Sequence, residues 1–213
     1  YPHPVIMNKE RAALLTAYLK QRGTLILPCR SVLKNENGIS EMLPQPGLLQ
    51  ELTGTDIRDF TYTSPAEEAV YADWNGTRLP MPVFNDILTP LPGTQVLARY
   101  TGSYYAGEAA LTERHTGQGR VLHLGSAFSR ETLPKLLSYA GAVSPFTGLI
   151  EADGKDVELT LRRKGDKNFL FVLNFHASEV SYTLLKPMHS LFTGKEVSGP
   201  QTLPAFGAAV YEV

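Results

Sequence analysis

The feature that most constrains the fold of this chain is a change of pattern at Gly141. Before that residue, helical and extended hydrophobic patterns alternate along the chain. After it the helical patterns vanish, and short runs of alternating apolar and polar residues follow one another. The sequence therefore predicts two domains, an α/β domain over 1–142 and an all-β domain over 150–213, with a linker within 145–154.

An amphipathic helix over 8–22 opens the first domain. Asn8 can cap its N-terminus, and Gly23 directly follows its last residue. Its apolar face is expected to consist of four residues at helical spacing, Leu14, Leu15, Tyr18 and Leu19. The strand over 24–27 follows through that single glycine, which is typical of the αβ unit of a parallel sheet.

The rest of the first domain reads as strands with two further helices. A polar loop over 30–45 comes first. Strands are expected over 57–63, 67–74, 77–81, 95–100, 104–115 and 120–124, and helices over 47–52 and 131–140. We expect Asn75-Gly76 to form a hairpin turn. Four prolines, at positions 80, 82, 90 and 92, are expected to break the intervening segment into short pieces.

The second domain reads as short strands separated by glycine turns. Strands are expected over 157–162, 169–175, 180–184, 190–192 and 208–213. The length suits two packed sheets, so we predict a small antiparallel β-sandwich.

Composition excludes several classes of function. The net charge of −1 on 213 residues gives no basic surface for nucleic acid, and no apolar run is long enough to span a membrane. The single cysteine excludes an internal disulfide, and the five histidines show no metal-ligand spacing. No cofactor motif is present, so we expect neither a metal nor a cofactor. A single thiol fits a reducing compartment, so we expect a cytoplasmic location.

Two residues in the polar loop region invite a catalytic interpretation, and neither has the context for it. Cys29 follows a strand, but Pro28 and Arg30 flank it where a nucleophile elbow has glycines, and no helix begins after it. The pair Asn35-Glu36 matches the dipeptide that carries the acid in barrel glycosidases. Here it lies well past the strand in a polar run, so a solvated carboxylate is the better interpretation. We therefore predict no catalytic residue in this chain.

Three residues are candidates for a subunit interface or for a position close to a sugar. Arg30 and Asn35 lie in the polar loop, and Trp74 precedes the predicted Asn75-Gly76 turn. An aromatic ring at a hairpin tip can stack on a sugar face or anchor a subunit contact, although ordinary packing explains it equally well.

Four stretches carry a resemblance to a known family. They read LLTAYLKQRGTLILPCRSVLKNENG, LPGTQVLARYTGSYYAGEAALTERHTGQGRVLHLGS, NFLFVLNFH and LFTGKEVSG with the closing LPAFGAAVYEV. In this order they resemble the C-terminal part of family-42 glycoside hydrolases, the β-galactosidases, over nearly the whole chain. Val32 departs from the family pattern, in which glycine usually follows Arg-Ser.

The resemblance implies a larger parent. In that family a TIM barrel holds both catalytic glutamates, and the parent hydrolyses terminal β-galactosides with retention. A flavodoxin-like or class I glutamine-amidotransferase-like trimerisation domain follows, without the cysteine nucleophile, and then a small β-sandwich. This chain resembles the last two parts, and the first of these is incomplete at its N-terminus. The start at YPHPVIMN, without an initiator methionine, fits the expectation of a fragment. We expect this fragment to serve self-association, as a trimer, and structural support.

Two alternatives stay open at this point. The chain could be an amidotransferase-like small-molecule-binding or thiol enzyme domain fused to a β-sandwich. It could also contain a carbohydrate-binding accessory module, which predicts sugar affinity in 150–213.

Overall fold

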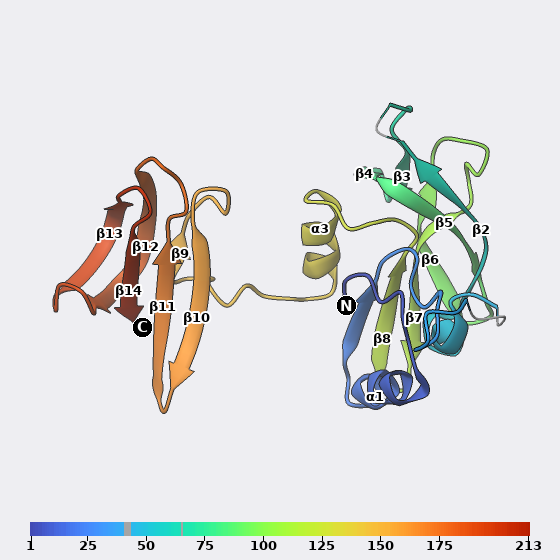
Figure 1. Ribbon diagram of the computed structural model, residues 1–213, viewed down its shortest axis with the longest axis horizontal. Coiled ribbons are helices and arrows are strands. Elements are labelled where there is room, and N and C mark those ends of the chain that lie inside the picture. Colours follow the sequence, from blue (N-terminus) through green and yellow to red (C-terminus); the bar gives the residue numbers. More distant parts are fainter. Residues whose placement is uncertain (41–43, 65) are drawn as a thin grey trace. The chain divides into compact units, whose positions relative to one another are not determined.

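The chain divides after Gly141 into two units, Tyr1–Gly141 and Ala142–Val213 (Figure 1). The computed structural model describes residues 1–40, 44–64 and 66–213. Positions 41–43 of the predicted polar loop therefore lie outside the described residues. Each unit has hydrophobic core residues of its own.

The first unit is mostly β-strand with few helices. Its elements are α1 (Lys9–Lys20), β1 (Thr24–Leu27), η1 (Gly47–Leu49), α2 (Gln50–Thr53), β2 (Thr55–Thr63), β3 (Tyr71–Trp74), β4 (Thr77–Pro80), β5 (Val83–Pro90), β6 (Thr94–Tyr100), β7 (Ala109–Thr116), β8 (Gly119–Leu124) and α3 (Thr132–Tyr139). The eight strands form one sheet in the order β1-β8-β7-β6-β3-β4, and β5 pairs with both β2 and β7. The predicted α/β pattern is present only where β1 pairs with β8 in parallel. Most of the other strand pairs in this sheet are antiparallel.

The predicted αβ unit at the start is confirmed. Asn8 caps α1, because its Oδ1 accepts a hydrogen bond of 2.9 Å from the Arg11 amide. The strand β1 then pairs with β8 in parallel. The predicted apolar face is wrong in part, because Leu14 and Tyr18 are exposed and Leu19 is the buried residue of the helix. The Tyr18 ring instead covers Gly23, where a Cβ atom would collide with it.

The proline-rich segment is the main error of the sequence prediction in this unit. It forms an unbroken eight-residue strand, β5, because Pro82 precedes the strand and Pro90 ends it. Prolines at strand ends remove no hydrogen bond from the interior of the ladder. Two predicted strands are shorter than expected: β3 begins at Tyr71, and β7 begins at Ala109 after a turn.

The second unit is a six-stranded antiparallel sheet around its own core. Its strands are β9 (Ile150–Glu151), β10 (Glu158–Lys164), β11 (Lys167–Leu173), β12 (Val180–Ser190), β13 (Glu196–Leu203) and β14 (Ala208–Glu212). The order is β10-β11-β14-β12-β13, and β9 pairs with β12. The described strands form one continuous sheet rather than the two predicted, because the end of the irregular strand β12 pairs with β14. The predicted linker contains β9, and β13 was not predicted.

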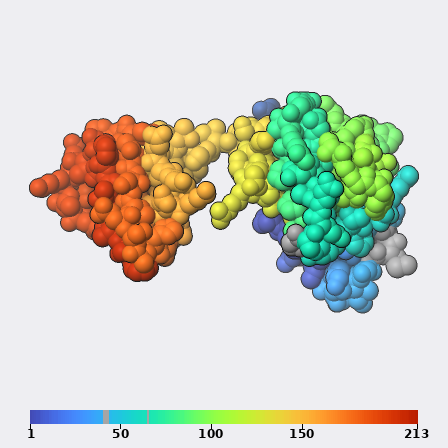
Figure 2. All heavy atoms as spheres, turned by 90° about the horizontal axis from the view of Figure 1, so that it is seen from above, coloured from blue at the N-terminus to red at the C-terminus, as the bar shows by residue number. Residues whose placement is uncertain are grey.

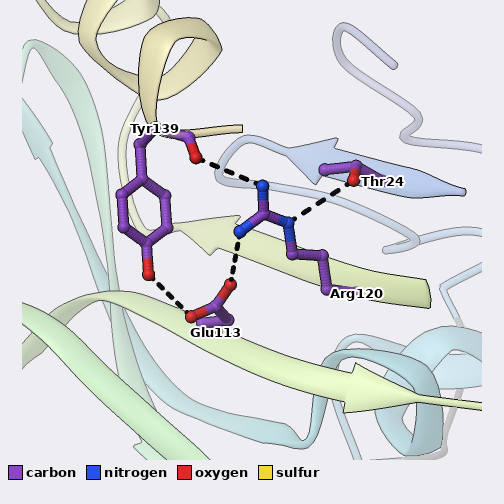
Figure 3. A network of polar contacts seen from close by, with 4 residues as sticks. All are labelled: Thr24, Glu113, Arg120 and Tyr139. Atoms are coloured by element: carbon purple, nitrogen blue, oxygen red, sulfur yellow. Dashed lines mark hydrogen bonds and ion pairs between the residues drawn. The ribbon is translucent and has the colours of Figure 1, made fainter. Parts of the chain in front are cut away.

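An ion pair between the buried Glu113 and the partly exposed Arg120 joins four elements of the first unit (Figure 3). Arg120 on β8 donates to Glu113 on β7 over 3.1 Å, to the carbonyl of Tyr139 in α3 over 3.2 Å, and to Thr24 on β1 over 3.4 Å. The Tyr139 hydroxyl donates to the other oxygen of Glu113 over 2.7 Å. The network thus ties β1, β7 and β8 to α3.

We expect removal of this carboxylate to be costly. Glu113→Ala leaves the Arg120 charge without its ionic partner and should lower the free energy of unfolding by about 3–5 kcal/mol. Tyr139→Phe removes a single hydrogen bond and should cost about 2 kcal/mol. Urea unfolding followed by fluorescence of Trp74, the chain's single tryptophan, reports on the first unit. The exposed Glu108 offers a matched control, since Glu108→Ala should stay within about 0.5 kcal/mol. Equal costs for the two glutamate variants would contradict the assignment.

Candidate subunit-contact site

Polar groups gather where the parallel strands β1 and β8 end. The Cys29 amide after β1 donates to the Ser126 carbonyl after β8 over 3.1 Å. The Asp86 amide on β5 donates to the Gly125 carbonyl over 2.6 Å. The buried Tyr100 hydroxyl lies 3.0 Å from the carbonyl oxygens of both Asp86 and Gly125. These bonds fix the turn after β1 against β5, and so they decide where Arg30 emerges.

Asp86 is a fully buried carboxylate in this cluster. Its Oδ2 accepts a hydrogen bond of 2.6 Å from the Arg30 amide. Its Oδ1 has no hydrogen-bond partner among the described residues. Burial raises the pKa of Asp86 to about 6, although the Arg30 amide and the Arg30 charge act in the opposite direction.

The side chain of Arg30 lies on aromatic rings. Its Cζ is 3.7 Å from the ring centroid of Phe60 and 5.4 Å from that of Phe84. The Phe84 ring is in turn 5.4 Å from the ring of Tyr62. The register of β2 and β5 pairs Phe60 with Asp86 and Tyr62 with Phe84, so all four share one face. We call Arg30, Phe60, Tyr62 and Phe84 the Arg30 patch.

The Arg30 patch is both exposed and incompletely satisfied. Phe60 is 47% exposed and Tyr62 is 57% exposed. Within the described residues, the Arg30 guanidinium makes no hydrogen bond and no ion pair. A stacked guanidinium with free donors can bind a carboxylate through two parallel hydrogen bonds. Arginine and tyrosine are also enriched among the residues that dominate protein interfaces.

Backbone strain surrounds the patch. Arg30 has φ 58°, Val32 has φ 56° and Val83 has φ 69°. Left-handed backbone is unfavourable for any residue with a Cβ, and especially for β-branched valine. Such strain costs on the order of 1–3 kcal/mol per residue and gathers at functional sites. The Val32 conformation also explains why glycine suits this position.

The other predicted candidates lie elsewhere. Asn35 holds its own turn, because its Oδ1 accepts from the amides of Asn37 and Ile39 over 3.0 and 3.1 Å. Glu36 is exposed, as expected for a solvated carboxylate. Trp74 is half-buried and its ring lies 5.0 Å from that of Tyr139, edge to face, which favours ordinary packing over an exposed aromatic at a hairpin tip. Interface roles for Arg30, Asn35 and Trp74 remain predictions.

Sequence reasoning missed the partners of Arg30. The apolar alternation of Phe60 and Tyr62 in DFTYT was a usable signal for a strand with one aromatic face. No local sequence pattern indicates that Asp86 is buried, because its burial depends on the pairing of β5 with β2.

The first unit is therefore a strand-rich domain that carries an exposed aromatic surface around Arg30. No cluster of three or more metal-binding side chains occurs in the part of the chain that the structure describes. None of the described helices has the length and apolar character needed to cross a membrane.

Comparison with known proteins gives the family. Residues 1–143 match the β-galactosidase trimerisation domain, and residues 156–212 match the β-galactosidase C-terminal domain. The chain therefore belongs to the family-42 β-galactosidases. It is similar to β-galactosidase BgaB of Geobacillus sp. (strain Y412MC61), with 26% identity over 80% of this chain and 25% of that protein. It is equally 26% identical to β-galactosidase LacA of Lactobacillus acidophilus, over 84% of this chain and 26% of that protein.

A solved structure agrees with these relatives. The crystal structure of β-galactosidase from Bacillus circulans sp. alkalophilus superposes with a TM-score of 0.84 and 25% identity, covering 99% of this chain and 32% of that one. The chain spans about a quarter of the length of the two curated relatives.

We expect Asp86 to make the stability of the first unit depend on pH. In the folded chain the Asp86 carboxyl group has a pKa of about 6, against 3.8 for an ordinary aspartate. The resulting stabilisation is fully present below about pH 4 and is lost as the pH rises through 6, a total of about 3 kcal/mol. Asp86→Asn removes the titration, so its unfolding free energy should fall less than that of the parent between these pH values.

Urea unfolding at about pH 4 and pH 7 measures this difference, and the comparison cancels the contribution of all other carboxylates. The exposed Asp166 supplies the control, since Asp166→Asn should leave the pH dependence unchanged. A pH profile of Asp86→Asn that follows the parent would show that Asp86 titrates normally.

Proposed function

We propose that this chain is the non-catalytic C-terminal part of a β-galactosidase. The parent would hydrolyse terminal non-reducing β-D-galactosides with retention, using two glutamates of a TIM barrel outside this chain. The support is the match of both units to family domains, together with relatives about four times as long. Within the parent, residues 1–142 would serve oligomerisation and residues 150–213 would give structural support.

The Arg30 patch carries the proposed contact between subunits. It joins an aromatic surface to a charged group with free donors, and a rigid hydrogen-bonded turn holds both in place. Because little side-chain freedom is left to lose on binding, such a surface suits a specific contact. A closed trimer requires a heterologous contact, so the patch would meet a different surface of the next subunit, with a carboxylate opposite Arg30.

The finer fold assignment belongs to the same proposal. The first unit would have a flavodoxin-like or amidotransferase-like fold. The parallel pairing of β1 with β8 and the approach of α1 support this, since parallel strands with a covering helix characterise those folds. We also propose a cytoplasmic parent, for which the single reduced cysteine is the support.

The thiol-enzyme alternative has little chemical support. Cys29 is 1% exposed, and burial raises the pKa of its thiol to about 12. His123 is no base for it, because its Nδ1 lies 2.8 Å from the Thr55 hydroxyl and burial lowers its pKa to about 4. A nucleophilic cysteine needs the opposite environment, with access to solvent and a lowered pKa.

We expect Arg30→Ala to weaken assembly of the full-length enzyme. Loss of a central arginine should cost about 2 kcal/mol or more per contact, which shifts trimer dissociation to at least about 30-fold higher concentration. Arg30→Lys keeps the positive charge but loses the planar group that stacks on the rings. Its trimer should therefore dissociate at a concentration between those of the parent enzyme and of Arg30→Ala. Sedimentation over a range of concentrations measures the effect.

The control is Arg11→Ala, which removes an exposed arginine from α1 and should leave assembly unchanged. An unaltered trimer in Arg30→Ala would refute the patch as the contact. Trp74→Ala is a poorer probe, because it also removes the packing on Tyr139.

We expect the native chain to resist alkylation at Cys29. At about pH 8 a thiol with a pKa of about 12 is ionised roughly 1000-fold less than one with the ordinary value of 9.0. Labelling by iodoacetamide, followed by mass spectrometry, should therefore be slower by at least that factor in the native chain than in urea. Rapid labelling of the native chain would revive the thiol-enzyme alternative.

A further inference from the structure

A cavity of about 450 Å³ opens beside β2, where Thr61 and Thr63 face it and Tyr62 of the Arg30 patch borders it. Thr61 and Thr63 of β2 form one wall, Tyr71 and Arg78 of the β3–β4 hairpin another, and the segment from Thr101 to Tyr105 the third. Figure 2 shows the teal surface of the hairpin region beside the light green surface of the 101–105 segment. The volume is within the range of about 300–1,000 Å³ that small-molecule sites occupy.

The cavity wall combines flat surfaces with hydrogen-bonding groups of both kinds. The Arg78 guanidinium lies over the Tyr71 ring, with Cζ 3.5 Å from the ring centroid. The Thr61 hydroxyl donates to the Tyr105 hydroxyl over 3.2 Å, which orients that phenol. Glu68 is exposed on the wall and makes no hydrogen bond or ion pair within the described residues. Donors and acceptors thus face the same space.

A second cavity of about 290 Å³ adjoins the first and is mainly apolar. The residues that line it alone are Ser64, Pro80, Met81, Pro82 and Val83. The two cavities share five wall residues, Tyr62, Thr63, Glu67, Ala69 and Val70. A ligand with one polar and one apolar end would therefore find a matching chamber for each end.

The wall carries charges of both signs, Glu67 and Glu68 together with Arg78, so it offers no field of one sign for a simple ion. A neutral ring with many hydroxyls suits these groups, because each hydroxyl both donates and accepts and the C–H face of the ring can lie on an aromatic surface. We propose that the cavity binds a neutral saccharide unit, with an apolar aglycone in the adjoining chamber. This site does not depend on the assembly role of the Arg30 patch.

Binding to the 213-residue chain tests the proposal. Phenyl β-D-galactoside, free galactose and phenol are titrated separately into labelled protein, and backbone amide shifts are followed by NMR. The glycoside should move the amides of Thr61–Thr63, Tyr71, Arg78 and Tyr105, and it should bind at least about fivefold more tightly than galactose or phenol. Shifts restricted to other regions, or no saturable shifts at all, would overturn the proposal.

Two variants make the site assignment specific. Arg78→Gln and Glu68→Gln each remove one charged partner of the sugar hydroxyls and should weaken glycoside binding by about 10-fold. Arg162→Gln removes an exposed arginine of β10 in the other unit and should change nothing. A sugar affinity that survives both pocket variants would overturn the proposal, as would tighter binding of an extended peptide at the same amides. Assembly of the full-length Arg78→Gln enzyme should be normal, which separates this test from that of the Arg30 patch.

Discussion

The Arg120 guanidinium is the group on which the arrangement of the first unit depends. It lies on β8, between the parallel neighbour β1 and the antiparallel neighbour β7, and it reaches side chains on both as well as the end of α3. A buried ion pair contributes little net stability compared with apolar packing. The hydrogen bond to Thr24 requires one register, however, because a shift of β1 by one residue would place the Thr24 side chain on the other face of the sheet, away from Arg120. The network therefore favours one register of β1, and that register sets where the chain leaves the strand.

Local elements of this fold could be read from the sequence, because local residues determine them. The Asn8 cap and the Gly23 exit define α1, and Asn75-Gly76 forms the β3–β4 hairpin with φ of 50° and 79°. The strand β13 was missed for a physical reason. It lies at the edge of its sheet and buries little more than Leu203, so it needs no regular apolar alternation. The pairing of β1 with β8 joins residues almost a hundred positions apart, which no local pattern encodes.

The Arg30 patch shows a second limit of sequence reasoning. The sequence placed Arg30 in the loop that follows the strand over 24–27, but it could not show what the side chain would contact. The ladder between β2 and β5 has an irregularity between Ile57 and Asp59, and this shift pairs Phe60 with Asp86. Regular pairing would put Phe60 opposite Asn85 and would separate the aromatic rings from the turn that carries Arg30. One irregular residue thus decides the composition of the patch.

The strand β2 links the two proposed sites. It pairs only with β5 among the described strands, and an edge of this kind needs a partner or a cover. Its Phe60 side carries the patch, its Thr61 side lines the cavity, and Tyr62 belongs to the patch while also bordering both cavities. Tyr62 is thus the one side chain that the patch and the cavities have in common.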